Sequence, residues 1–207
     1  MIRHRLHIIT TGAQELDQVA SILRNCPLEL LDSIHIREKH RTARELLQWC
    51  TALRALLPGQ VSLRLNDRLD VAAAIRTDSV QLAYHSLPPE MARQILPAGL
   101  RICCSVHSPE EARQAEAAGA DELLFGHIYA TDSKAGVVPR GLEALRGVVS
   151  AVRIPVTAIG GIRPEHVPDV LDAGAEGIAV LSSVLLHKDP AGQIRAYRAA
   201  LEQAGGS

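Results

Sequence analysis

The sequence predicts a (β/α)8 TIM barrel, and three observations support this expectation. Short β-branched or apolar runs alternate with longer amphipathic stretches along the whole chain. The alternation gives eight strand-then-helix units, which are typical of a parallel sheet with crossover helices. The length of 207 residues fits a single barrel domain covering residues 1–207. An open doubly wound sheet is the alternative, but such sheets rarely need so many units in a chain of this length.

Each expected strand is a short apolar or β-branched run, as in sheets that are buried on both faces. The expected strands are Leu6–Thr10, Ser33–Arg37, Val61–Leu65, Ser79–Leu82, Ile102–Val106, Glu122–Gly126, Val156–Ile159 and Gly177–Leu181. The helices expected between them are Leu16–Arg24, Ala43–Leu56, Leu69–Ile75, Glu90–Leu96, Pro109–Ala118, Leu142–Val149, Glu165–Ala173 and Ile194–Gln203.

Residues at the element boundaries support this assignment. Ser108 precedes Pro109 and two glutamates, a sequence typical of a helix start. Gly119 and Gly174 each follow an expected helix and precede the next strand. The longest segment without an assigned element runs from His127 to Arg140, and loops of that length are usually functional or mobile.

Composition excludes several classes of protein. The chain has 22 Lys and Arg against 23 Asp and Glu, without the basic excess of a nucleic-acid-binding protein. Hydrophobic residues make up 47%, enough for a large core, yet no apolar run is long enough to cross a membrane. The apolar run near the N-terminus is too short for a signal peptide, so we expect a soluble cytoplasmic protein. None of the four cysteines forms a C-x-x-C pair, and we expect reduced thiols.

In a TIM barrel, active-site groups lie at the C-terminal ends of the strands and in the loops that follow. Gly160 and Gly161 follow the seventh expected strand, and Ser182 and Ser183 follow the eighth. Small residues let backbone amides approach an anion, and these two loops form the usual phosphate site of this fold. We therefore expect these four residues to bind a phosphate, although glycines that serve only a tight turn are the alternative.

The segment after the sixth strand is the richest in chemistry. His127 stands at the mouth end of that strand, and an imidazole is well suited to proton transfer near neutral pH. Thr131 and Ser133 offer hydroxyl groups, and Lys134 offers a mobile cation suited to phosphate. We expect His127 to be catalytic and the other three to assist substrate binding.

Other strand ends add candidate contacts. Strand alternation places Arg37 and Lys39 on the same face as His35, where a cationic cluster would attract a carboxylate or a diphosphate. Asp67 follows the third strand and could either hold a metal ion or form an ion pair with Arg37. His107 follows the fifth strand and could either line the site or orient a neighbour.

A set of motifs occurs in order across nearly the whole chain and resembles the thiamine phosphate synthase/TenI superfamily. The motifs are His35-Ile36-Arg37-Glu38, Leu65-Asn66-Asp67-Arg68, Ser105-Val106-His107-Ser108, Phe125-Gly126-His127-Ile128-Tyr129, Ile159-Gly160-Gly161 and Val180-Leu181-Ser182-Ser183. The resemblance implies a TIM barrel.

The superfamily has two branches. The resemblance implies that the synthases join a pyrimidine diphosphate to a thiazole phosphate with Mg²⁺, and their motifs carry Phe-Gly-Pro after strand six and a Gln-Asp pair after strand four. This chain has His127 and Tyr84-His85 at those places and is similar there to the TenI branch, the thiazole tautomerases. That similarity implies that His127 is the acid/base residue converting a non-aromatic carboxythiazole phosphate to its aromatic isomer.

Physical reasoning favours the same branch. Ionisation of a diphosphate usually needs Mg²⁺ held by carboxylates, and Asp67 without a second acid is a poor site. A tautomerisation needs no metal or other cofactor, so we expect none and predict a thiazole tautomerase. Two alternatives stay open, a thiamine phosphate synthase and a non-catalytic binder of thiazole or thiamine phosphates. A homodimer is plausible, and no nucleic-acid or membrane partner is expected.

Overall fold

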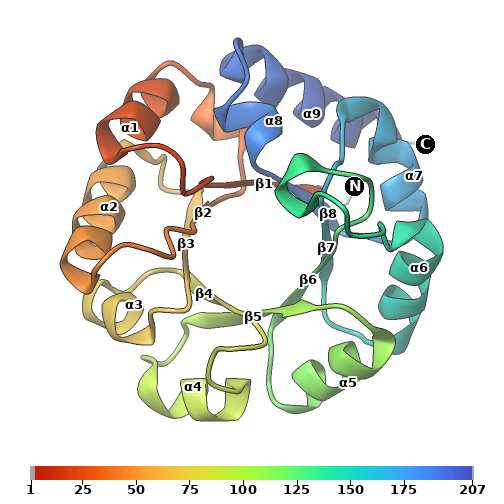
Figure 1. Cartoon of the computed structure of the whole chain (residues 1–207), viewed down its shortest axis with the longest axis horizontal. Helices are drawn as coiled ribbons and strands as arrows, with labels where there is room; N and C mark the ends of the chain where they lie inside the picture. Colours follow the sequence, from red (N-terminus) through yellow and green to blue (C-terminus); the bar gives the residue numbers. More distant parts are fainter. Residues whose placement is uncertain (1–2, 207) are drawn as a thin grey trace.

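The computed structural model describes residues 3–206 and shows a closed barrel of parallel strands in chain order, ringed by helices (Figure 1). The TIM-barrel expectation is therefore confirmed. The strands are β1 (Arg5–Ile9), β2 (Ser33–Ile36), β3 (Ser62–Asn66), β4 (Ser79–Leu82), β5 (Arg101–Val106), β6 (Glu122–Gly126), β7 (Val156–Ile159) and β8 (Gly177–Val180). β1 pairs with both β2 and β8, and this pairing closes the sheet.

The helices agree with the expected ones to within a few residues at most ends. They are α1 (Leu16–Arg24), α2 (Ala43–Leu56), α3 (Leu69–Ile75), α4 (Pro89–Ile95), α5 (Pro109–Ala117), α6 (Gly141–Ala151), α7 (Val167–Asp172), α8 (Ser182–Leu185) and α9 (Pro190–Ala204). Short 3-10 turns occupy Leu28–Leu30, Asp132–Lys134 and Pro164–His166. Two differences matter. The sequence did not predict α8, and the last helix begins at Pro190 because Asp189 caps it.

Alternation along each strand separates the core from the barrel interior. In β2, Ile34 and Ile36 belong to the main hydrophobic cluster, whereas His35 lines a cavity at the barrel mouth. Ile9, Leu124 and Ala179 form a separate small apolar cluster. The apolar residues between barrel and helices hold the fold, and the alternate positions are free to carry polar groups.

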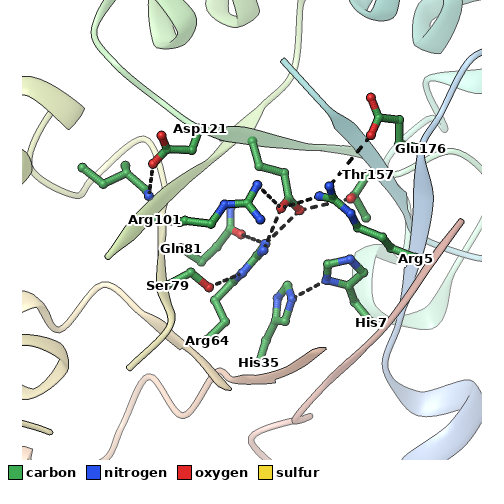
Figure 2. A network of polar contacts seen from close by, with 12 residues as sticks. Arg5, His7, His35, Arg64, Ser79, Gln81, Arg101, Asp121, Thr157 and Glu176 are labelled. Carbon is green, nitrogen blue, oxygen red and sulfur yellow. Dashed lines mark hydrogen bonds and ion pairs between the residues drawn. The ribbon is translucent and has the colours of Figure 1, made fainter. Parts of the chain in front are cut away.

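A buried carboxylate, that of Glu122, organises the interior below the cavity. Arg64 donates to both of its oxygens, at 3.2 and 2.9 Å, and Thr157 donates at 3.1 Å. Arg5 lies 3.2 Å and Arg101 3.5 Å from the same carboxylate. Figure 2 shows the three arginines converging from different strands. Burial by itself raises the pKa of a carboxyl group, but the positive charges around Glu122, led by that of Arg64, lower its pKa to about 2.

Two imidazoles stand beside this network. His7 Nδ1 and His35 Nε2 lie 2.9 Å apart, and both residues are buried, with exposed fractions of 2% and 0%. Burial lowers the pKa of His7 to about 4 and that of His35 well below its usual value. Both rings are therefore neutral at physiological pH.

Two further expectations concern the described residues. In residues 3–206, none of the helices combines the length and apolar character needed to span a bilayer. The cysteines are free thiols, and burial raises the pKa of Cys50, Cys103 and Cys104 to about 12.

Glu122→Gln is expected to lower the free energy of unfolding by about 3–5 kcal/mol, because it leaves the buried Arg64 without a matched charge. Urea denaturation measures the change. Glu143→Gln on the exposed face of α6 is the matched control and should unfold like the wild type. Equal stability of both variants would show that the buried pair does not hold the barrel interior.

Acid should destabilise the protein through His7. Unfolded His7 takes up a proton near its ordinary pKa of 6.5, whereas folded His7 resists protonation until about pH 4. The free energy of unfolding should therefore decrease as the pH is lowered from about 6.5 to about 4. Above this range it should not depend on the protonation of His7. A His7→Gln variant should lose part of this slope, and His40→Gln, at an exposed site, should keep it.

Candidate active site

A cavity of about 570 Å³ opens at the C-terminal ends of the strands. Every residue that the sequence analysis singled out for the site lines it. These residues are Arg37, Lys39, Asp67, His107, His127, Thr131, Ser133, Lys134, Gly160, Gly161, Ser182 and Ser183. The structure brings them together from six strand ends, although their individual roles stay predictions.

The cavity has a neutral floor and a cationic rim. Its floor includes Ile9, Leu124 and Ala179 together with the polar side chains of Gln81 and Ser105. The cations lie nearer the mouth, because Arg37 follows the last residue of β2, and Lys39 and Lys134 are exposed loop residues. Such a cavity suits a ligand with an uncharged ring and anionic ends.

Buried atoms without a partner also mark the cavity wall. Among the described residues, Asn66 Oδ1 and His35 Nδ1 are buried without a hydrogen bond, and both residues line the cavity. Buried polar atoms are normally satisfied, so unpaired ones beside a cavity are typical of a binding site.

The glycines after β7 have a packing role that the sequence did not reveal. Gly160 and Gly161 have φ of 101° and 64°, which favours glycine. A Cβ on Gly160 would lie 2.2 Å from His127 Cβ, and one on Gly161 would lie 2.4 Å from the carbonyl oxygen of Ala130. The same two segments are also joined by a backbone hydrogen bond, because the amide of Ile128 donates to the carbonyl of Ile159. These glycines therefore bring the segment after β6 against the turn after β7.

The segment 127–140 crosses the rim of the barrel beside β7 and β8 (Figure 1). It contains the 3-10 turn at Asp132–Lys134 and ends at Arg140. Arg140 Nε donates to the carbonyl of Gly126 at 3.1 Å, and Nη1 donates to that of His107 at 2.9 Å. The backbone amide of Arg140 donates to the carbonyl of His127. Arg140, which the sequence analysis did not select, thus fastens both ends of the loop together.

His127 itself is 7% exposed, and its Nε2 lies 3.2 Å from the carbonyl oxygen of Val137. The carbonyl can only accept, so Nε2 carries the hydrogen. His107 lines the cavity and is also oriented, because Glu111 lies 3.2 Å from its Nδ1. Ser183 stands in the first turn of α8, and the nearby helix α9 is tied to the turn after β7 because the Tyr197 hydroxyl donates to the carbonyl of Ile162.

Of the two roles expected for Asp67, the ion pair with Arg37 does not form, and the role of metal ligand stays a prediction. Asp67 pairs with neither Arg37 nor a second carboxylate: Ser86 donates to one oxygen at 2.5 Å, and His85 lies 3.4 Å from the other. It is the sole carboxylate among the residues that line the cavity. Within residues 3–206 no group of three His, Cys, Asp or Glu side chains could hold a metal ion. A magnesium ion at this site would have Asp67 as its one carboxylate ligand from the cavity lining and would take its other ligands from water and a bound diphosphate.

Arg140→Ala should loosen the loop and leave the barrel intact. We expect faster amide hydrogen exchange across residues 128–139 and unchanged protection in the strands, because the side chain bonds only the carbonyls of Gly126 and His107 at the strand ends. Arg146→Ala, which removes only an exposed ion pair with Glu143 on α6, is the matched control. Unchanged exchange in the Arg140 variant would contradict the proposed fastening.

Comparison with known proteins identifies the family. The model of the family described as thiamine monophosphate synthase matches residues 6–184. The chain belongs to this family. The thiamine-phosphate synthase of Moorella thermoacetica is 40% identical over 176 residues, covering 84% of each chain. The protein of the same name from Natronomonas pharaonis is 42% identical over 176 residues, covering 83% of this chain and 82% of its own.

The solved structures agree with this membership. Thiamine phosphate pyrophosphorylase from Pyrococcus furiosus superposes with a TM-score of 0.84 at 35% identity and covers 98% of both chains. A 3-hexulose-6-phosphate synthase matches with a TM-score of 0.77 at 19% identity, a similarity that concerns the fold alone.

These comparisons overturn the predicted thiazole tautomerase. The relatives described above are named as synthases, and nothing in these comparisons supports an assignment to the TenI branch. The prediction relied on His127 and on the missing acid after β4, two positions only. The ordered motifs had identified the superfamily correctly, and the error lay in the choice of branch.

Proposed function

We propose that the chain catalyses the thiamine-phosphate synthase reaction, joining hydroxymethylpyrimidine diphosphate to thiazole phosphate with release of diphosphate. The observation that carries the proposal is a single cavity that combines a cationic rim with the glycine and serine turns after β7 and β8. Relatives named thiamine-phosphate synthase support it.

The two anionic groups are assigned to different parts of the rim. The diphosphate lies against Arg37 and Lys39, with Lys134 reaching it from the loop after β6. The phosphate of the thiazole lies against the turns after β7 and β8 and against the hydroxyl groups of the loop after β6. The residues that bind it are Gly160, Gly161, Ser182, Ser183, Thr131 and Ser133. Asp67 is the one carboxylate among the residues that line the cavity, and it accepts a hydrogen bond from Ser86.

The chemistry exchanges one bond for another. The bond between the methylene carbon of the pyrimidine and the diphosphate oxygen breaks, and its electron pair leaves with the diphosphate. The thiazole nitrogen then supplies the electron pair of the new carbon–nitrogen bond. Cations placed on the leaving group stabilise the charge that develops on it. The apolar floor formed around Leu124 excludes water that would otherwise capture the activated carbon.

His127 has a different role in this reaction from the one first predicted. The thiazole nitrogen carries no proton when it attacks, so the bond exchange needs no proton shuttle. His127 instead forms the wall of the cavity against Gly160, with its Nε2 hydrogen committed to Val137. We therefore assign it to substrate packing.

Purified protein should form thiamine phosphate from the two substrates in a buffer containing MgCl2, as followed by chromatography. Arg37→Ala should lower kcat/KM at least about a hundredfold, because it removes charge from the leaving diphosphate. Arg113→Ala on the outer face of α5 is the matched control and should retain full activity.

Two results would reject the proposed function. One is binding of thiazole phosphate without product from the complete substrate pair, which would identify a binder. The other is full activity of Arg37→Ala, which would move the diphosphate elsewhere in the cavity.

A further inference from the structure

The polar network below the cavity continues into its floor. Arg64 is held by the bidentate contact with Glu122 and by a hydrogen bond from Nε to Ser79 Oγ at 2.9 Å. Its Nη1 also donates to Gln81 Oε1 at 3.2 Å, and Gln81 Nε2 donates to Ser105 Oγ at 3.1 Å. Figure 2 shows Gln81 beside Arg64 in the barrel interior.

The direction of each hydrogen bond in this chain is determined by Arg64. A guanidinium group can donate but cannot accept, so the amide atom that faces Arg64 must be the oxygen. The amide nitrogen of Gln81 then faces Ser105 and donates to it. Gln81 is fully buried and cannot turn to solvent. Ser105 Oγ is consequently an acceptor in this contact, and its own hydrogen must point elsewhere.

The cavity is where that hydrogen can go. Ser105 is half-buried and lines the floor, and across residues 3–206 its hydroxyl donates no hydrogen bond. The nearby floor is formed by apolar side chains such as Leu124 and Ala179, whereas the cations lie at the rim. The part of a ligand that reaches Ser105 is therefore its uncharged ring.

We propose that Gln81 is a positioning residue: held by Arg64, it commits the hydroxyl hydrogen of Ser105 to an acceptor atom on the heterocyclic ring of the substrate. The identity of the ring rests on the proposed function. The direction of the Ser105 hydroxyl is a property of the free protein and can be tested without substrate.

Neutron diffraction from perdeuterated crystals of the free protein tests the direction. The expected map shows the Gln81 amide deuterons facing Ser105 and the Ser105 deuteron facing the cavity. A Ser105 deuteron directed at Gln81 would overturn the proposal, whatever the enzyme proves to catalyse.

Kinetics of variants test the contact with the ring. Ser105→Ala and Gln81→Glu should each raise the KM of the substrate whose ring occupies the floor by about tenfold, with kcat nearly unchanged. The new carboxylate accepts only, so it draws the Ser105 hydroxyl away from the ligand. Gln81→Met leaves that hydroxyl free to turn and should raise KM less.

The double variant separates positioning from a structural role. Adding Gln81→Glu to Ser105→Ala should give no further rise in KM, because the hydroxyl that Gln81 directs is gone. Multiplying effects, or equal effects of Gln81→Met and Gln81→Glu, would overturn the proposal. Should Gln81→Glu fail to fold, Gln81→Met combined with Ser105→Ala gives the same comparison. If the wild type makes no thiamine phosphate, the proposed function fails, and the neutron map still decides the role of Gln81.

Discussion

The interior of this barrel depends on the buried pairing of Glu122 with Arg64. A carboxylate inside a protein is tolerated only when charges and donors compensate for lost water, and here three arginines and a threonine do so. The pairing has a consequence beyond charge compensation. Because Arg64 is held rigidly, Gln81 has one orientation and Ser105 receives a hydrogen bond. The buried Glu122–Arg64 pair therefore determines the direction of the hydrogen bonds in the cavity floor.

The walls of the cavity depend on close backbone contact instead of charge. Gly160 and Gly161 leave room for the segment after β6, and Arg140 ties the end of that segment to its beginning. A long loop is consequently held as part of the site. The same contact places His127 against Gly160, which explains why a residue with attractive acid/base properties is almost fully buried.

The family comparison changes how the polar residues of the mouth are interpreted. The absence of a second acid near Asp67 had argued against diphosphate chemistry, because such chemistry usually employs a protein-held metal. The structure shows that Asp67 is engaged by Ser86, while Arg37 and Lys39 face the same cavity. Side-chain cations can meet the charge of a diphosphate, so the lack of a carboxylate pair did not justify the choice of the tautomerase branch.

The sequence alone determined the barrel and predicted which residues would line the cavity at its mouth. Strand periodicity and glycine positions are local signals, and a parallel barrel brings all strand ends to one mouth, so motifs at those ends had to meet there. Only the tertiary structure decided which groups pair inside. Glu122 and Arg64 are 58 residues apart in the sequence. Nothing in the sequence around Gln81 indicates that its side chain accepts a hydrogen bond from Arg64. Hydrogen-bond direction and buried charge compensation depend on neighbours from other strands, and no local pattern encodes them.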